Sequence, residues 1–175
     1  YKKIAETTDL AIMPYNTQGW TPRFMAKLAT IDKIIGIKDP CHYPHNLFIA
    51  IRMIGDRFVW IGNKRHQAEV LQYRYQAGIH GFTAGLINFI PKPLLEMHEA
   101  GIKKDWEKLI KLQRMLAPIE KLRDKYGDAA LPKAGLDLIG LAGGPVRPPR
   151  VNITEEGKEE LKREMQKLGT YVRFP

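Results

Sequence analysis

Four short apolar runs mark the first half of the chain. They begin at residues 10, 34, 58 and 79, and they read Leu10-Ala11-Ile12-Met13, Ile34-Ile35-Gly36-Ile37, Phe58-Val59-Trp60-Ile61 and Ile79-His80-Gly81-Phe82-Thr83-Ala84. Continuous rather than alternating runs are typical of strands covered on both faces, as in a parallel sheet. Helical periodicity fills the gaps over 22–29, 44–54 and 67–77. Since a parallel crossover usually contains a helix, the pattern predicts repeated strand–helix units.

After residue 84 the pattern predicts helices alone. The first is expected over 94–100, with two prolines in its first turn and Gly101 as its stop. A long amphipathic helix follows along 106–122, where Pro118 is expected to kink or divide the path. Two more helices are expected over 132–141 and 155–168. The fold class is therefore α/β, either half of an eight-unit barrel or a small doubly wound sheet, with a helical appendix. We place the boundary so that 1–101 belongs to the strand–helix part and 102–175 to the appendix.

Charge, hydropathy and cysteine content argue against several classes of function. The chain has 175 residues and a net charge of +9, but its Lys and Arg residues alternate with acids, as along 155–163, which is typical of a solvated helix face rather than a nucleic-acid surface. No apolar run reaches the roughly 18 residues of a membrane-spanning helix. A single cysteine, Cys41, excludes an intrachain disulfide and fits a reducing compartment, so we expect a cytoplasmic protein. The first residues read as the end of a helix, and we expect the chain to be the C-terminal part of a longer one.

Candidate chemistry gathers where the predicted strands end, because functional groups lie at the carboxyl ends of parallel strands. Lys38 closes a strongly apolar run. Burial disfavours the charged form of an amine, so a lysine here could act as a neutral nucleophile toward a ketone or aldehyde. Tyr15 ends the preceding strand and could carry protons for that reaction. Position alone leaves two alternatives open: Lys38 could extend its ammonium to solvent, and Tyr15 could serve packing.

Several motifs in order resemble one enzyme family. They are Pro14-Tyr15-Asn16, Ile34-Ile35-Gly36-Ile37-Lys38-Asp39, Trp60-Ile61-Gly62, the stretch from Gly78 to Pro91, Lys133-Ala134-Gly135-Leu136 and Gly144-Pro145-Val146-Arg147-Pro148-Pro149. Together they resemble the dihydrodipicolinate synthase and N-acetylneuraminate lyase family of (β/α)8 barrels. The resemblance spans nearly the whole chain and implies strands five to eight of the barrel plus its helical appendix.

The resemblance also implies a mechanism and a site. Lys38 forms a Schiff base with pyruvate or another 2-keto acid, and Tyr15 relays protons, without a metal or other cofactor. Gly62, Thr83 and Asn16 are expected to bind substrate, although Asn16 could instead tie loops together. In the family the missing half carries the Thr-Thr-Gly motif that binds the substrate carboxylate and a tyrosine lent across a subunit contact. The family also implies a homotetramer, and a half barrel alone is expected to be inactive.

Two features qualify these expectations. Synthases of the family follow the Tyr-Asn pair with a Val-Pro stretch and an arginine that binds the second substrate, whereas this chain has Thr17-Gln18-Gly19-Trp20-Thr21. The keto-deoxy sugar acid aldolase and deoxyglucarate dehydratase branches therefore stay open, as does a non-catalytic member that only binds a keto acid. Cys41, His42 and His45 form a candidate metal cluster, which we rank below the imine chemistry because zinc sites usually add a distant ligand.

Overall fold

The computed structural model describes residues 1–40, 43–63 and 70–175 and divides into two compact units. The described residues up to Thr83 belong to the first unit, and the second begins at Ala84. The expected boundary after residue 101 stays a prediction.

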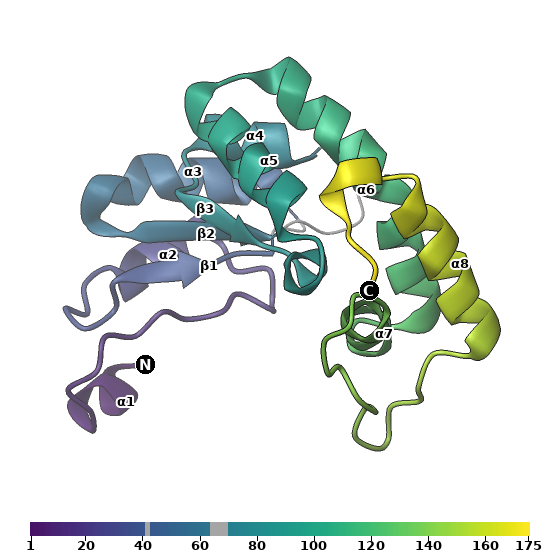
Figure 1. The fold of residues 1–175 in the computed structure, drawn as a ribbon. Coiled ribbons are helices and arrows are strands. Elements are labelled where there is room, and N and C mark those ends of the chain that lie inside the picture. The colour runs from purple at the N-terminus through teal and green to yellow at the C-terminus, as the bar shows by residue number, and fades with distance from the viewer. Residues whose placement is uncertain (41–42, 64–69) are drawn as a thin grey trace. The chain divides into compact units, whose positions relative to one another are not determined.

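The first unit is built on a parallel sheet of three named strands, β1 (Gly36–Lys38), β2 (Val59–Asn63) and β3 (Gly81–Thr83), in the order β1-β2-β3 (Figure 1). Ile37 pairs with Trp60, and Gly62 pairs with Phe82. The helices of this unit are α1 (Lys2–Glu6), α2 (Pro22–Leu28), α3 (Pro44–Ile54) and α4 (Val70–Ala77), with the 3-10 turn η1 (Gly55–Arg57) before β2. Sequential order without reversal is the arrangement of a barrel segment, whereas a doubly wound sheet reverses its order at a switch point.

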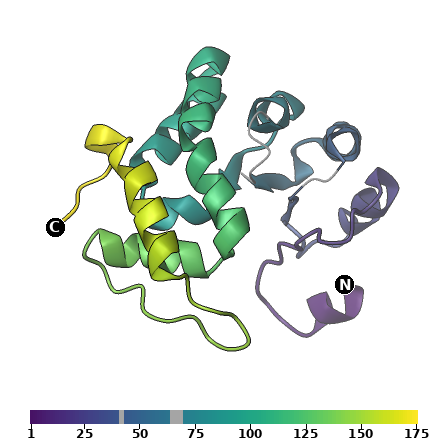
Figure 2. The ribbon, with the colours of Figure 1, turned by 90° about the vertical axis from the view of Figure 1, so that its right-hand side faces the viewer.

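The helices cover one side of this sheet. Helices α2, α3 and α4 form a row outside the strands, in which α2 contacts α3 and α3 contacts α4 (Figure 2). Fully buried apolar side chains fill the layer between them; the largest are Trp60, Phe58, Met25, Ile34, Ile37, Leu47 and Leu71. Ile37 and Trp60 on the helix-covered face are fully buried, whereas Ile35 and Val59 are about two fifths exposed. Burial along these strands therefore alternates, and only one of the two faces that the continuous apolar runs predicted to be covered is covered in this chain.

The expected strand at 10–13 is not a strand in this structure. Ile12 and Tyr15 each form an isolated parallel bridge, to Ile34 and to Lys38. Pro14 lies between the two bridges and has no N–H to donate, which interrupts the ladder at this point. The segment nevertheless occupies the place of a fourth strand beside β1.

The second unit is helical, as expected. It contains η2 (Gly85–Asn88), α5 (Pro91–Lys103), α6 (Trp106–Tyr126), α7 (Ala130–Leu138), α8 (Glu155–Gln166) and η3 (Gly169–Tyr171). Helix α5 packs on α6, and α8 packs on both α6 and α7. The Thr154 side chain caps α8 by accepting a hydrogen bond from the Gly157 N–H, which agrees with the capping pattern of the sequence.

Two predictions for this unit were wrong in detail. Gly101 does not stop α5, which continues to Lys103 and ends at Lys104 in a left-handed conformation. Gly101 is buried instead, so its small size serves packing. Pro118 does not divide α6, which runs unbroken on both sides of it, so that part of the prediction was wrong, and the alternative of a kink stays a prediction. Buried Leu116 and Ile119 flank the proline, and their packing holds the helix together despite the lost hydrogen bond.

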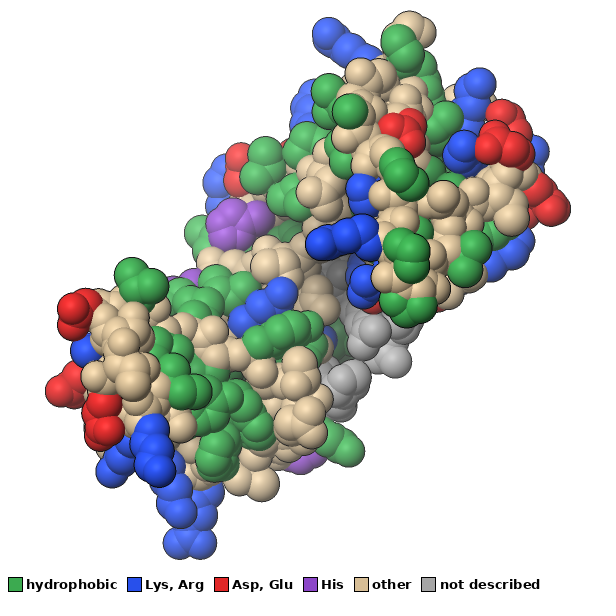
Figure 3. Space-filling view, turned by 90° about the horizontal axis from the view of Figure 1, so that it is seen from below, with side chains coloured by type: hydrophobic (Ala, Val, Ile, Leu, Met, Phe, Trp, Pro, Cys, Tyr) green, Lys and Arg blue, Asp and Glu red, His purple; other side chains and the backbone are tan. Residues whose placement is uncertain are grey.

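The surface carries charged side chains of both signs and also exposes apolar side chains. Figure 3 shows Lys and Arg side chains mixed with Asp and Glu, and apolar side chains gathered in patches on the same face. Met13, Ile35 and Val59 of the first unit are each about two fifths exposed. No helix among the described residues is long and apolar enough to cross a membrane.

Candidate active site

Lys38 and Tyr15 lie next to each other at the carboxyl end of β1. The backbone joins them on both sides, because the Lys38 N–H donates to the Pro14 carbonyl at 3.0 Å and the Asn16 N–H donates to the Lys38 carbonyl at 2.9 Å. The Lys38 Nζ stands 4.5 Å from the centre of the Tyr15 ring. Lys38 is half-buried and Tyr15 is 46% exposed, so a small molecule could reach both. The structure therefore brings the predicted nucleophile and the predicted proton carrier into contact range.

Asn16 points away from this accessible pair into the unit. It is only 4% exposed, and both ends of its amide are engaged. Its Nδ2 donates to Asp39 Oδ2 at 3.0 Å, and its Oδ1 accepts from the Trp20 N–H at 3.0 Å. Asn16 thus connects the residue after Lys38 to the loop that follows Tyr15.

Gly62 and Thr83 continue the same edge of the sheet. Lys38 on β1 pairs with Ile61 on β2. Thr83 on β3 pairs with Asn63, which lies two residues after Ile61 toward the carboxyl end of β2. Gly62 is buried, and a Cβ there would lie 2.9 Å from the Ile79 Cδ1, so a larger residue would require the end of the Ile79 side chain to move. Thr83 is exposed at the end of β3. Their predicted contacts with substrate stay predictions.

Two buried charged residues behind this edge were not predicted as part of a site. Asp39 is 4% exposed and donates its N–H to the Ile61 carbonyl at 2.8 Å. Arg74 is 5% exposed, and its guanidinium donates to the carbonyls of Pro40, at 2.7 Å, and of Asn63. A Lys-Asp pair at a strand end was visible in the sequence, but Arg74 reaches the site from the middle of α4.

The candidate metal cluster lies partly outside the described residues, because Cys41 and His42 are not among them. His45 is in α3, with its ring edge-on to Tyr43 at 6.0 Å between centres. Within the described part of the chain, no group of three His, Cys, Asp or Glu side chains is arranged to hold a metal ion.

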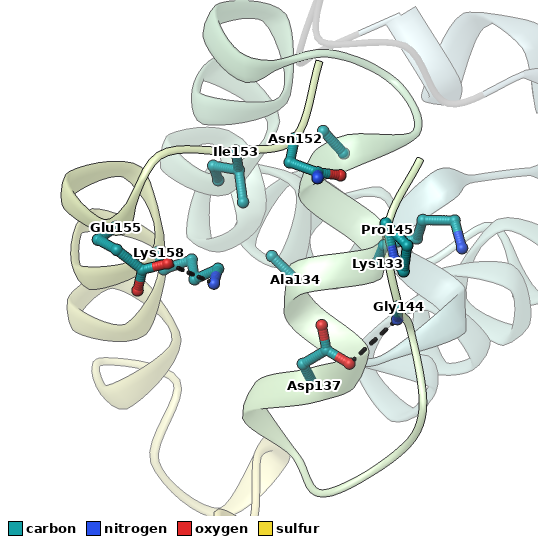
Figure 4. A pocket seen from close by; sticks show the side chains of 10 residues that line it. Lys133, Ala134, Asp137, Gly144, Pro145, Asn152, Ile153, Glu155 and Lys158 are labelled. Atoms are coloured by element: carbon teal, nitrogen blue, oxygen red, sulfur yellow. Dashed lines mark hydrogen bonds and ion pairs between the residues drawn. The ribbon is translucent and has the colours of Figure 1, made fainter. Parts of the chain in front are cut away.

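A separate hollow of about 340 Å³ lies in the second unit, between α7, the connection along 144–153 and α8 (Figure 4). Its charged groups satisfy one another or the backbone. Asp137 accepts from the N–H groups of Gly143 and Gly144, at 2.8 and 3.3 Å, and Lys158 pairs with Glu155 at 2.6 Å. Lys133 donates to the Gly143 carbonyl at 2.5 Å. These contacts fasten the connection to α7 and explain the residues without a ligand.

Comparison with known proteins decides the family. The sequence matches the dihydrodipicolinate synthetase family over residues 1–168. This chain belongs to that family. A protein of Delftia acidovorans named probable 5-dehydro-4-deoxyglucarate dehydratase is 30% identical over 96% of this chain and 57% of its own length. The 4-hydroxy-tetrahydrodipicolinate synthase of Methanopyrus kandleri is 29% identical over 97% of this chain and 57% of its own length.

Solved structures agree on the fold. Dihydrodipicolinate synthase from Oceanobacillus iheyensis superposes with a TM-score of 0.84 at 23% identity, and the match covers 97% of this chain and 58% of that one. The expected half barrel with a helical appendix is thereby confirmed, and the doubly wound alternative is excluded. The chain spans somewhat more than half the length of the family members that it matches.

Proposed function

We propose that this chain provides the Schiff-base half of the active site of a lyase that acts on pyruvate or a longer 2-keto acid. The observation that carries the proposal is the Lys38–Tyr15 pair, with the Lys38 Nζ 4.5 Å from the ring centre at the carboxyl edge of a parallel barrel sheet. This edge is where barrel enzymes place their catalytic groups. Membership of a family whose matched members are named dehydratase and synthase supports the assignment.

The reaction begins when the neutral amine of Lys38 attacks the ketone carbon of the substrate. Tyr15 passes a proton to the carbonyl oxygen, which leaves as water and gives a protonated imine. The imine withdraws electrons and acidifies the neighbouring carbon. Loss of a proton there permits aldol addition, or elimination of a hydroxyl from the next carbon, or, by the reverse path, cleavage of a carbon–carbon bond. Water then hydrolyses the imine and returns the free amine.

Gly62 and Thr83 extend the substrate site along the same edge. A glycine allows the backbone to approach the substrate closely, and Thr83 offers a hydroxyl and a carbonyl at the exposed end of β3. The carboxylate of the keto acid is expected to bind the family's Thr-Thr-Gly motif. In keeping with the family, we propose a cytoplasmic homotetramer that needs no cofactor.

We infer the dehydratase branch, because the loop after Asn16 has no arginine. Arg23, the nearest arginine that follows, is an exposed residue in the first turn of α2, where its backbone belongs to a helix rather than to the loop. The substrate in the name 5-dehydro-4-deoxyglucarate is a 2-keto acid with a methylene next to the ketone and a hydroxyl on the following carbon. An imine at Lys38 would favour loss of that hydroxyl as water.

The test is borohydride trapping in the full chain, with pyruvate and with 5-dehydro-4-deoxyglucarate, followed by peptide mapping. We expect one adduct, on Lys38, and none in Lys38→Arg, which keeps the positive charge but forms no imine. Lys27→Arg, an exposed lysine on α2, is the matched control and should trap normally. A full chain that binds the keto acid but never forms an adduct on Lys38 would establish the non-catalytic alternative. Turnover assays that include aspartate semialdehyde with pyruvate then distinguish dehydratase from synthase.

A further inference from the structure

The buried polar side chains of the first unit gather behind the candidate active site. Among the described residues of this unit, the buried polar and charged side chains are Asn16, Asp39 and Arg74. Asn16 directly follows Tyr15, and Asp39 directly follows Lys38. Burying a carboxylate or an amide costs free energy unless the group forms hydrogen bonds in the interior. The partners of these side chains therefore indicate what the buried groups do.

Neighbouring residues of an extended chain point to opposite faces, and burial follows this rule here. Tyr15 and Lys38 face the accessible side, whereas Asn16 and Asp39 are each 4% exposed and face the interior. The Asn16 Nδ2 to Asp39 Oδ2 hydrogen bond of 3.0 Å therefore joins the two chain segments just beneath the catalytic pair.

The backbone pairing at this point is sparse. Tyr15 and Lys38 meet in an isolated bridge, and Pro14 interrupts the ladder toward Ile12. A slip of one residue in such a pairing would exchange Tyr15 for Asn16 on the accessible face. A buried side-chain bond between the next residues on both segments opposes that slip.

The same network reaches the surrounding loops. Asn16 Oδ1 accepts from the Trp20 N–H at 3.0 Å and so closes the loop after Tyr15. Arg74 donates to the Pro40 carbonyl at 2.7 Å and fixes the backbone immediately after Asp39. The loop from Asn16 to Trp20 is thus tied to the pair directly, and Pro40, next to Asp39, is held by Arg74.

We propose that Asn16 and Asp39 are positioning residues, whose buried hydrogen bond sets the register that places Tyr15 against Lys38. This inference rests on the proposed function and deepens it. It assigns Asn16 a role behind the catalytic pair, in place of contact with the keto acid. A displacement of about 1 Å in a catalytic group can lower the rate about 100-fold, so a register-setting bond has a measurable effect.

The test exchanges the two partners in the full chain. Asn16→Asp places two carboxylates at hydrogen-bond distance, and we expect the maximal rate of pyruvate adduct formation on Lys38 to fall about 100-fold. The pyruvate concentration for half-maximal rate should change less than about threefold, because substrate binding is untouched. The double variant Asn16→Asp with Asp39→Asn restores a donor and an acceptor with the roles exchanged. It should recover to within about tenfold of wild type.

Each outcome decides the question. A wild type that forms no adduct on Lys38 refutes the proposed function itself, whatever the variants do. If wild type forms the adduct, a normal maximal rate in Asn16→Asp, or an effect confined to the half-saturating concentration, overturns the positioning role. If Asn16→Asp does not fold, the double variant decides: recovery supports the inference, and a folded but inactive or an unfolded double variant refutes it.

Discussion

Replacing Gly36 with alanine should disrupt the sheet beneath the candidate active site. A Cβ at this position would lie 2.2 Å from the Val59 carbonyl oxygen on β2 and 3.0 Å from the Met13 Cε, whereas ordinary contacts begin at 3.4 Å. The strands must therefore separate by about 1 Å, although the hydrogen bond from the Val59 N–H to the Ile35 carbonyl, at 2.9 Å, holds them together. Overpacking costs about 1–3 kcal/mol, and a weakened ladder bond adds about 1 kcal/mol.

We expect Gly36→Ala to lower the free energy of unfolding of the full chain by about 3 kcal/mol, or about 100-fold in the equilibrium constant. Denaturant titration followed by circular dichroism measures this. Because Gly36 and Lys38 share a face of β1, borohydride trapping on Lys38 should slow in the same variant. Gly85→Ala is the control, since a Cβ there would lie 3.2 Å from the Arg123 guanidinium, a contact with a side chain that is much less close than 2.2 Å from a backbone carbonyl oxygen. It should lose about 1 kcal/mol or less. Equal losses in the two variants, or none in Gly36→Ala, would refute the reasoning.

Two further predictions concern the second unit. Asp137→Ala removes the acceptor for the Gly143 and Gly144 N–H groups, and we expect thermal unfolding to show a loss of about 1–2 kcal/mol in the free energy of unfolding. Asp137→Asn should lose less, because its amide oxygen is still an acceptor. Equal losses in the two variants would contradict this. The hydrogen bond from Lys125 Nζ, at 2.9 Å, lowers the pKa of the Glu160 carboxyl. A lowered folded-state pKa stabilises the protein above the usual glutamate pKa of about 4.3, and the stabilisation disappears as pH falls through the folded value. The melting temperature of wild type should therefore exceed that of Glu160→Gln at neutral pH and converge with it in acid; a constant difference would exclude this pair as the cause.

Local signals in the sequence predicted the helices well. Helix α3 runs over the predicted 44–54, with Pro44 at its start, and α2 ends one residue before the prediction. These elements are controlled by residues within one turn of their ends, such as proline at the first position and the capping Thr21. The strands agreed in place but differed in length, because pairing depends on a partner elsewhere in the chain. The segment at 10–13 shows this most clearly, since Pro14 prevents it from continuing the ladder.

The sequence likewise predicted only part of the candidate site. The adjacency of Lys38 and Tyr15 followed from two neighbouring strand ends, and the structure places them together. The support behind them could not be predicted. Arg74 lies 34 residues from Pro40 in the chain, and nothing in the weakly amphipathic sequence of α4 distinguishes it from a solvated arginine. Only the packing of α4 against β2 reveals that its guanidinium is buried.

Asn16 connects the segment that carries Lys38 to the loop that follows Tyr15. Through Asp39 it is tied to the segment that carries Lys38, and through the Trp20 N–H it holds the loop where this chain departs from the synthase pattern. The Trp20 contact uses a backbone group, so loop side chains can change without loss of that hydrogen bond. Trp20 also packs edge-on against Tyr1 and Phe24, at 5.9 and 5.2 Å between ring centres, which anchors the end of the loop independently. A loop fixed at both ends by such contacts can vary in sequence between them while the Lys38–Tyr15 pair retains its geometry.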